Sequence, residues 1–154
     1  SLSKSHGIPG IRLGFVYTQN EKIYSQIYQN LPIWNLNSFA ENYMEIALKF
    51  RGELALSFQK AKKDRQNLME LLDQINFISK VYTSSGSFLT FRVDNQNIAQ
   101  NLRSYLITKH NIYLKRLSNE GLGESNFFRV ALVSPPEINK LIKALKDYSN
   151  SNDL

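Results

Sequence analysis

The sequence predicts an α+β protein in which helices cover one face of an antiparallel or mixed sheet. Two observations support this fold class. Hydrophobic residues make up 42% and aromatic residues 12% of the 154 positions, which is enough for a globular core. In addition, the second half of the chain alternates short strand-like segments with segments of helical periodicity, an order typical of a sheet covered by helices.

The first third of the chain predicts one strand and two helices. The apolar run at residues 13–17 predicts a short buried strand, and the pattern of residues 21–29 predicts an amphipathic helix. A second helix is expected to run to about residue 50, because Asn35 or Asn37 can accept hydrogen bonds from the backbone N–H groups of its first turn.

A long helix is predicted over residues 53–75, after a break at Gly52. Apolar residues recur there at steps of three and four, which places them in one stripe along a helix of about 34 Å. The stripe consists of Leu54, Phe58, Ala61, Leu68, Leu72 and Ile75.

The remaining residues predict four strands and two helices. The predicted strands are residues 77–83, 88–93, 111–117 and 127–133, and the predicted helices are residues 97–109 and 136–148. Pro136 suits the first turn of the last helix, where a missing N–H group costs nothing. A loop containing Gly121 and Gly123 is expected between the last two strands.

The net charge of +6 does not by itself indicate a nucleic-acid partner. A cluster of basic residues lies within the predicted long helix, and no aromatic side chains are interleaved with it. We therefore interpret the cluster as a solvated helix face and expect no nucleic-acid partner. A basic, non-catalytic module that binds an anionic partner is the alternative. The cluster comprises Lys60, Lys62, Lys63 and Arg65.

Composition also argues against metal and membrane sites. The chain has no cysteine and only two histidines, His6 and His110, so a metal centre is not expected. No apolar run approaches the roughly 20 residues that a membrane-spanning helix needs, and the first residues lack the layout of a signal peptide. We expect a cytoplasmic protein with no membrane partner.

The first fourteen residues combine side chains that suit a phosphorylated carbonyl cofactor. The amine of Lys4 can bond to a carbonyl carbon, and hydroxyls and a guanidinium can bind phosphate. Glycines between them allow the backbone to approach a bulky ligand. The polar residues of this segment are Ser1, Ser3, Lys4 and Arg12, interspersed with Gly7, Pro9, Gly10 and Gly14.

This segment resembles the lysine motif of class I/II aminotransferases, which reads Ser-x-Ser-Lys-x-x-Gly-x-x-Gly-x-Arg-x-Gly. Every fixed position of the motif is met. The resemblance implies that the cofactor is pyridoxal 5′-phosphate (PLP) and that Lys4 is the lysine bonded to its aldehyde carbon. It also implies that Ser1 and Arg12 contact the cofactor phosphate and that Ser3 lies beside it. The spacing of Ser1 and Lys4 also fits a serine acylase, but the other motifs of that class are absent from this sequence.

Two arginines near the end of the chain are candidates to bind substrate. In FFRVAL, alternation places Phe128 and Val130 on one face of a strand and Arg129 on the other. A desolvated guanidinium needs a partner, either a ligand carboxylate or an internal acid. Arg129 resembles the family arginine that grips the substrate carboxylate. Arg116 resembles a second arginine, found in histidinol-phosphate aminotransferases and threonine-phosphate decarboxylases, which serves the substrate phosphate or carboxylate. An exposed strand-end arginine is the alternative for Arg116.

The stretch LPIWNLNSFA resembles the Pro-Trp-x-x-Asn segment of threonine-phosphate decarboxylases, although Ile33 is an extra residue within it. The resemblance implies that Trp34 and Asn37 line the substrate side of the site. For Trp34, a role as an anchor in the hydrophobic core is the alternative.

The family resemblance also implies a domain division and an activity. Residues 1–35 would be the remnant of the large PLP-binding domain, and residues 36–154 the bridging helices and the small C-terminal domain. We expect a portion of a longer homodimeric enzyme, inactive alone because family residues that surround the cofactor ring precede the lysine. The implied function is a PLP-dependent aminotransferase acting on an amino acid or a phosphorylated amino acid. Decarboxylation of a phosphorylated amino acid is the alternative.

Overall fold

The computed structural model describes residues 1–117 and 126–152. The chain divides into two compact units, Ser1–Phe58 and Gln59–Leu154. The predicted loop at Gly121 and Gly123 lies outside the described residues. The predicted domain boundary between residues 35 and 36 concerns a larger parent domain and stays a prediction.

The first unit consists of helices joined by irregular segments. It contains α1 (Glu21–Gln29), α2 (Ser38–Ala47), the short 3-10 helices η1 (Pro9–Ile11) and η2 (Leu48–Phe50), and the beginning of α3 (Arg51–Asp73). Asn37 caps α2, since its Oδ1 accepts a hydrogen bond of 3.0 Å from the Ala40 N–H. The two predicted helices and the Asn37 cap are confirmed.

Two predictions for this unit are wrong. Residues 13–17 form no strand, and Phe15, Val16 and Tyr17 are 71–79% exposed. A strand is stabilised by hydrogen bonds to a neighbouring strand, and within the described part of the chain none pairs with this segment. Gly52 does not break the helix either, because α3 runs through it and the change of geometry falls earlier, at η2. One glycine destabilises a helix by only about 1 kcal/mol.

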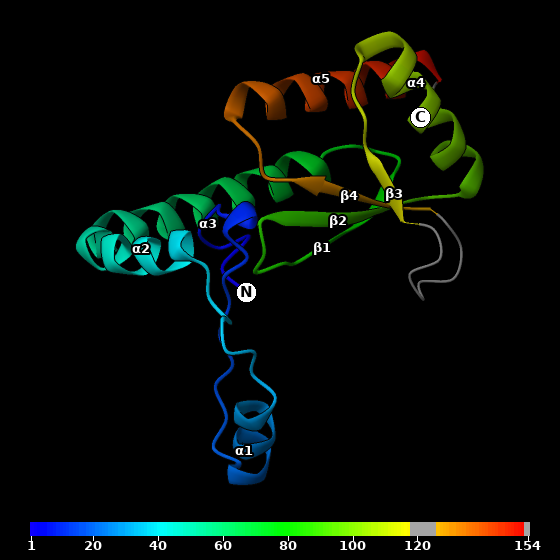
Figure 1. Ribbon diagram of the computed structural model, residues 1–154. Coiled ribbons are helices and arrows are strands. Elements are labelled where there is room, and N and C mark those ends of the chain that lie inside the picture. Colours follow the sequence, from blue (N-terminus) through cyan, green and yellow to red (C-terminus); the bar gives the residue numbers. More distant parts are fainter. Residues whose placement is uncertain (118–125, 153–154) are drawn as a thin grey trace. The chain divides into compact units, whose positions relative to one another are not determined.

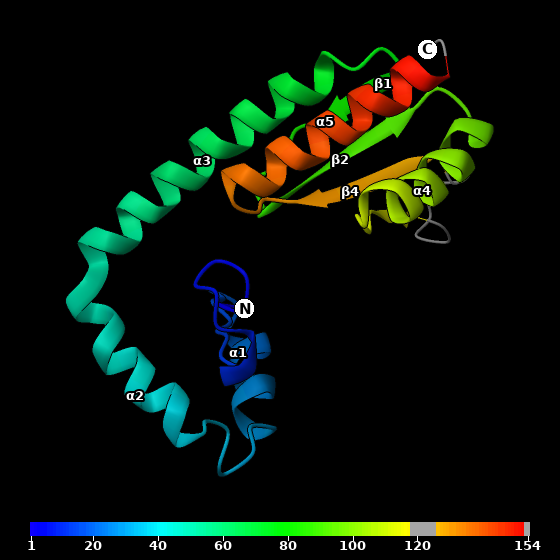
Figure 2. The same ribbon diagram turned by 90° about the horizontal axis from the view of Figure 1, so that it is seen from above.

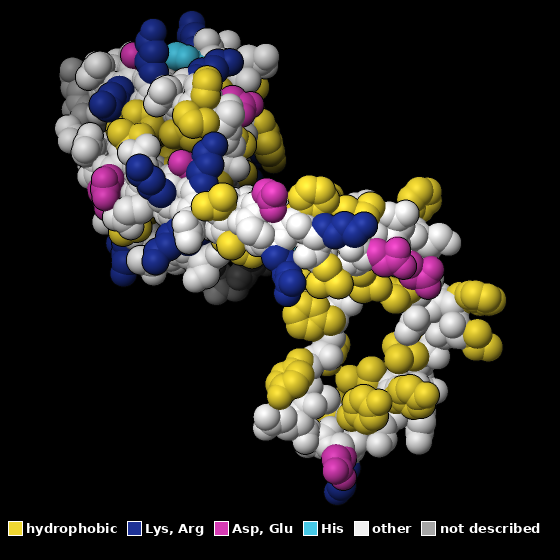
Figure 3. Space-filling model, turned by 90° about the vertical axis from the view of Figure 1, so that its left-hand side faces the viewer, with side chains coloured by type: hydrophobic (Ala, Val, Ile, Leu, Met, Phe, Trp, Pro, Cys, Tyr) yellow, Lys and Arg dark blue, Asp and Glu magenta, His cyan; other side chains and the backbone are white. Residues whose placement is uncertain are grey.

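The first unit buries little of its apolar surface. Among its residues, all of which are described, only Leu13 and Ala40 count as buried hydrophobic residues. Large side chains such as Trp34, 90% exposed, and Phe39, 81% exposed, face solvent. Figure 3 shows hydrophobic side chains, in yellow, at the surface of the molecule. The alternative of Trp34 as a core anchor is therefore wrong for this chain.

The second unit is built on a four-stranded antiparallel sheet (Figure 1). Its strands are β1 (Ile78–Tyr82), β2 (Phe88–Val93), β3 (Lys115–Leu117) and β4 (Phe127–Ala131), in the order β1-β2-β4-β3. Two helices, α4 (Gln96–His110) and α5 (Pro135–Ser151), lie on the same face of the sheet (Figures 1 and 2). The predicted α+β layer is confirmed.

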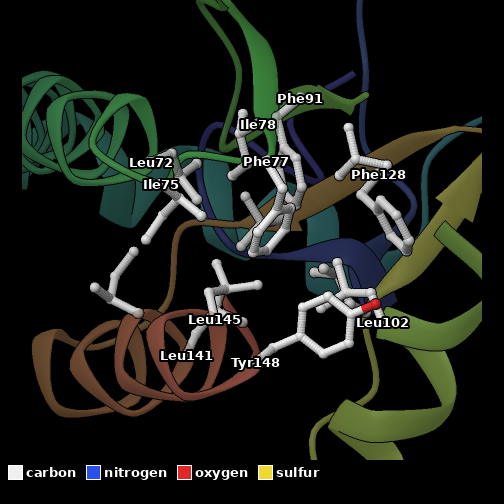
Figure 4. Packing of buried hydrophobic residues seen from close by; sticks show 14 of the residues in the cluster. Leu72, Ile75, Phe77, Ile78, Phe91, Leu102, Phe128, Leu141, Leu145 and Tyr148 are labelled. Atoms are coloured by element: carbon white, nitrogen blue, oxygen red, sulfur yellow. The ribbon is translucent and has the colours of Figure 1, made fainter. Parts of the chain in front are cut away.

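The core of the second unit lies between the sheet and these helices (Figure 4). Alternate residues of β2 and β4 point into it, as the period of two in a strand requires. Phe91 and Phe128, a cross-strand pair, stack with ring centroids 5.6 Å apart. Phe77 meets Tyr148 of α5 edge to face at 5.4 Å. This packing fixes which residues of the strands face away from the helices.

The strand β3 is shorter than predicted because the preceding helix ends late. Asn111 adopts a left-handed backbone conformation (φ 54°) and closes α4, its N–H bonding to the carbonyls of Leu106 and Ile107. The chain therefore becomes extended only after this cap, and strand pairing starts at Lys115. No described helix is long and apolar enough to cross a membrane.

The start of α5 carries a pH-sensitive cap. The Glu137 carboxylate accepts hydrogen bonds from the Ser134 hydroxyl (2.7 Å) and backbone N–H (3.2 Å), and these bonds lower the pKa of the Glu137 carboxyl. A carboxyl whose pKa is lowered by folding adds stability above its unfolded pKa and loses that contribution as the pH falls through its folded pKa. We therefore expect Glu137→Ala to lower the Tm at pH 7, and the difference from wild type to shrink toward pH 3.

Thermal unfolding of the full-length protein, followed by circular dichroism at several pH values, tests this expectation. Glu45→Ala, at an exposed position of α2, is the control. A difference in Tm between wild type and Glu137→Ala that stays constant as the pH falls would contradict the proposed contribution of the cap.

Candidate active site

The N-terminal segment folds into a closed loop that brings the ends of the motif together. The Leu2 N–H donates a hydrogen bond of 3.0 Å to the Leu13 carbonyl, and the His6 N–H donates one of 3.0 Å to the Leu2 carbonyl. A Cβ atom at Gly14 would lie 3.3 Å from Ser1 Cα, tighter than an ordinary contact. The absence of a Cβ atom at Gly14 therefore allows the backbone of this residue to lie close to Ser1.

Two residues of the loop have left-handed backbone conformations. Gly7 has a φ of 67°, which glycine adopts without strain. Arg12 has a φ of 58°, and in a non-glycine residue this conformation costs about 1–2 kcal/mol. Its Nη1 donates a hydrogen bond of 2.8 Å to the Pro9 carbonyl, which ties the guanidinium to η1. Strained backbone of this kind is concentrated at functional sites, where the surrounding structure enforces it.

The side chains around this loop fit a phosphorylated aldehyde such as PLP. The Ser1 hydroxyl donates a hydrogen bond of 3.0 Å to the Ser3 hydroxyl, so these two groups form one cluster. Lys4 follows directly and is exposed, which leaves its amine accessible to a carbonyl carbon. One amine, two hydroxyls and a guanidinium are the donor set that an aldehyde and a phosphate require.

His6 has a structural role that the sequence did not indicate. Its ring lies edge-on to Tyr43 of α2, with centroids 6.3 Å apart, and to Phe58 of α3, at 5.9 Å. Its Nδ1 also lies 2.8 Å from the Ser5 hydroxyl. The histidine thus packs the lysine loop against two helices of the same unit. A periodic pattern would not reveal this contact, since it joins segments far apart in the chain.

Asn37 connects α2 to the loop. Besides capping the helix, it donates a hydrogen bond of 2.9 Å from its Nδ2 to the Ile11 carbonyl, next to Arg12. One end of its amide therefore caps the helix and the other end holds the loop. Its predicted contact with substrate, and that of the exposed Trp34, stay predictions.

Arg129 lies in the second unit, in the middle of β4. Its neighbours Phe128 and Val130 are buried, and Arg129 projects on the opposite face, as the alternation predicted. The guanidinium carbon lies 5.1 Å from the centroid of the Phe88 ring. A half-buried arginine on a face not covered by the helices can offer its N–H groups to a carboxylate or phosphate.

The sheet register separates Arg116 from Arg129. Arg116 pairs with Phe128, whose side chain is buried, whereas Lys115 pairs with Arg129. Burial, and next the positive charge of Arg103, lower the pKa of Arg116. Sequence reasoning missed Lys115, because its position opposite Arg129 follows from the register between the two strands. The predicted role of Arg116 in holding substrate stays a prediction that this register does not support.

An accessible lysine in a closed loop with a left-handed arginine, followed by a small antiparallel sheet that bears a second arginine, agrees with the aminotransferase class of proteins. The family model for aminotransferase class I and II matches residues 1–145. The chain belongs to this family.

Two relatives show which members of the family the chain is similar to. A histidinol-phosphate aminotransferase of Christiangramia forsetii is 31% identical over 150 residues, covering 97% of this chain and 41% of the relative. A threonine-phosphate decarboxylase of Salmonella typhimurium is 24% identical over 147 residues, covering 96% of this chain and 39% of the relative.

A solved structure shows the same fold. The crystal structure of the histidinol-phosphate aminotransferase from Clostridium acetobutylicum matches with a TM-score of 0.86 and 30% identity, over 97% of this chain and 44% of that one. The chain thus spans less than half the length of the relatives it matches, and the predicted resemblance to this part of the family is confirmed.

Proposed function

We propose that the full-length protein is a PLP-dependent aminotransferase whose substrate is an amino acid or amino alcohol that carries a phosphate. The observation that carries this proposal is the closed loop of residues 1–14, which contains an accessible lysine, two hydrogen-bonded serine hydroxyls and an arginine in a left-handed backbone conformation. The similarity to histidinol-phosphate and threonine-phosphate enzymes supports the phosphorylated substrate class.

The residues of the loop have distinct roles in this proposal. Lys4 would hold PLP through its aldehyde carbon, and Ser1, Ser3 and Arg12 would hold its phosphate. When bound, PLP supplies an electron sink that stabilises negative charge on the substrate carbon next to the amine. The hydrogen bond from Arg12 to the Pro9 carbonyl limits where the guanidinium can lie, so the phosphate is met by a pre-oriented donor.

Lys4 also moves a proton. With cofactor and substrate bound, the Lys4 amine would act as the general base that takes the proton from the substrate carbon. Arg129 binds the anionic group of the substrate through two parallel N–H bonds and so fixes which bond of that carbon is broken.

Decarboxylation is a second candidate, favoured by the similarity to a threonine-phosphate decarboxylase. Both reactions use the same residues, and the orientation of the substrate carboxylate decides between them. The groups that hold this carboxylate, Arg129 first among them, would therefore select between loss of a proton and loss of carbon dioxide.

One assay separates the two reactions. The full-length protein with PLP is supplied with 2-oxoglutarate and either L-histidinol phosphate or L-threonine O-3-phosphate, and glutamate and carbon dioxide are measured. We expect glutamate to accumulate without carbon dioxide release. Release of carbon dioxide without glutamate would favour the decarboxylase, and neither product would contradict both assignments.

We also propose that the full-length protein is a cytoplasmic homodimer. Active sites of this family are formed where two subunits meet, and the exposed apolar surface of the first unit is consistent with burial against further protein.

A further inference from the structure

The face of the sheet that points away from α4 and α5 contains an aromatic ring next to Arg129. Phe88 pairs with Ala131 and Thr90 pairs with Arg129 in the antiparallel register of β2 and β4. Phe88 and Arg129 are therefore diagonal neighbours on one face, close enough for long side chains to touch. The Arg129 Cζ lies 5.1 Å from the Phe88 ring centroid, within the range of a cation–π contact.

The turn between β1 and β2 fixes the place of this ring. A Cβ atom at Gly86 would lie 3.2 Å from Phe88 Cε1 and 3.5 Å from Cδ1, so the ring fills the space that glycine leaves. The Gly86 N–H donates a hydrogen bond of 2.9 Å to the Ser84 hydroxyl. Arg65 of α3 donates one of 3.1 Å from its Nη1 to the Gly86 carbonyl. Both the N–H and the carbonyl of Gly86, two residues before Phe88, are therefore fixed by hydrogen bonds.

The contact leaves the arginine free to bind an anion. An aromatic ring attracts the flat face of a guanidinium, whereas carboxylate and phosphate bind to the N–H groups at the edge of the guanidinium. An arginine side chain has considerable rotamer freedom, and part of it is lost each time a ligand is bound. A ring that already restricts the guanidinium lowers this entropic penalty on binding.

We propose that Phe88 is a positioning residue for Arg129, which holds the guanidinium ready for the anionic group of the substrate. This inference rests on the proposed function, because it takes Arg129 as the group that binds this anion. Phe88 itself does not contact the reacting atoms. Its effect should therefore appear in substrate affinity more than in the rate of the chemical steps.

The same sheet offers a matched control. The Lys80 Nζ lies 5.0 Å from the centroid of the Tyr82 ring, a contact of the same kind and length on β1. Tyr82→Leu removes an aromatic partner from a cation that the proposed mechanism does not use. A general loss of sheet packing should therefore affect this variant as much as Phe88→Leu.

The experiment compares Phe88→Leu, Phe88→Tyr and Tyr82→Leu in the full-length protein with PLP. Phe88→Leu is expected to raise the KM for the phosphorylated substrate by about 3- to 30-fold, with kcat nearly unchanged. Phe88→Tyr, which keeps the ring, should restore the KM, and Tyr82→Leu should leave it unchanged. Gly86→Ala, which crowds the ring without removing it, should raise the KM in the same direction.

A calorimetric titration with inorganic phosphate gives a readout that does not depend on turnover. Weaker phosphate binding in both Phe88→Leu and Arg129→Ala supports the positioning role even if the wild type uses neither phosphorylated substrate, a result that would overturn the proposed function alone. An unchanged KM and phosphate affinity in Phe88→Leu, equal losses in Tyr82→Leu, or no phosphate binding by the wild type would overturn the inference about Phe88.

Discussion

Replacement of Lys4 by alanine in the full-length protein is expected to abolish the visible absorbance band that forms when PLP is added. The band requires a bond between the cofactor and a lysine amine, and Lys4 is exposed within the closed loop that groups the proposed phosphate ligands. Turnover should fall by about 100- to 10,000-fold or more, because the same amine serves as the general base. Absorbance titration with PLP and steady-state kinetics measure the two effects.

Lys22→Ala is the matched control for this variant. Lys22 is an exposed lysine of the same unit, in the first turn of α1. The absorbance band and the rate should survive in this control. Persistence of the band in Lys4→Ala would overturn the central assignment, because another amine would then have to hold the cofactor.

Arg129→Ala is expected to lower kcat/KM of the full-length protein by about 30- to 5,000-fold. This range corresponds to the roughly 2–5 kcal/mol that is lost when one partner of a desolvated charge pair is truncated. The guanidinium is half-buried on β4, and its Cζ lies 5.1 Å from the centroid of the Phe88 ring. Arg129→Lys should recover only part of the loss, because an ammonium group cannot form the two parallel bonds of a guanidinium.

Arg92→Ala controls for the loss of a positive charge on the same sheet. Arg92 lies on the neighbouring strand β2 and is exposed, with its Nε donating a hydrogen bond of 3.1 Å to the Ser79 hydroxyl. Its removal should change kcat/KM little. A wild-type rate in Arg129→Ala would exclude Arg129 from the site.

The elements set by local patterns could be predicted from the sequence. The bounds of β2 and α1 agree with the predicted ranges, because alternation and helical periodicity are properties of consecutive residues. The Asn37 cap could be predicted for the same reason, since the acceptor lies three residues from its N–H donor. The lysine motif is likewise a short segment whose residue types indicate its chemistry.

Features that depend on distant partners could not be predicted in this way. Residues 13–17 have the composition of a strand, but no strand pairs with them among the described residues. The pairing of Lys115 with Arg129 depends on the register between two strands. The sequence-based prediction used the spacing between Arg116 and Arg129 along the chain, and it therefore named Arg116 rather than Lys115. A one-residue difference in register moves a side chain to the other face of a sheet.

The left-handed conformation of Arg12 has a consequence for anyone who would engineer this protein. Glycine at this position relieves the backbone strain, so a screen that selects only for thermal stability favours Arg12→Gly. The gain would remove the guanidinium and with it a proposed anchor of the cofactor. Thermal stability and cofactor binding therefore place opposite demands on this one residue.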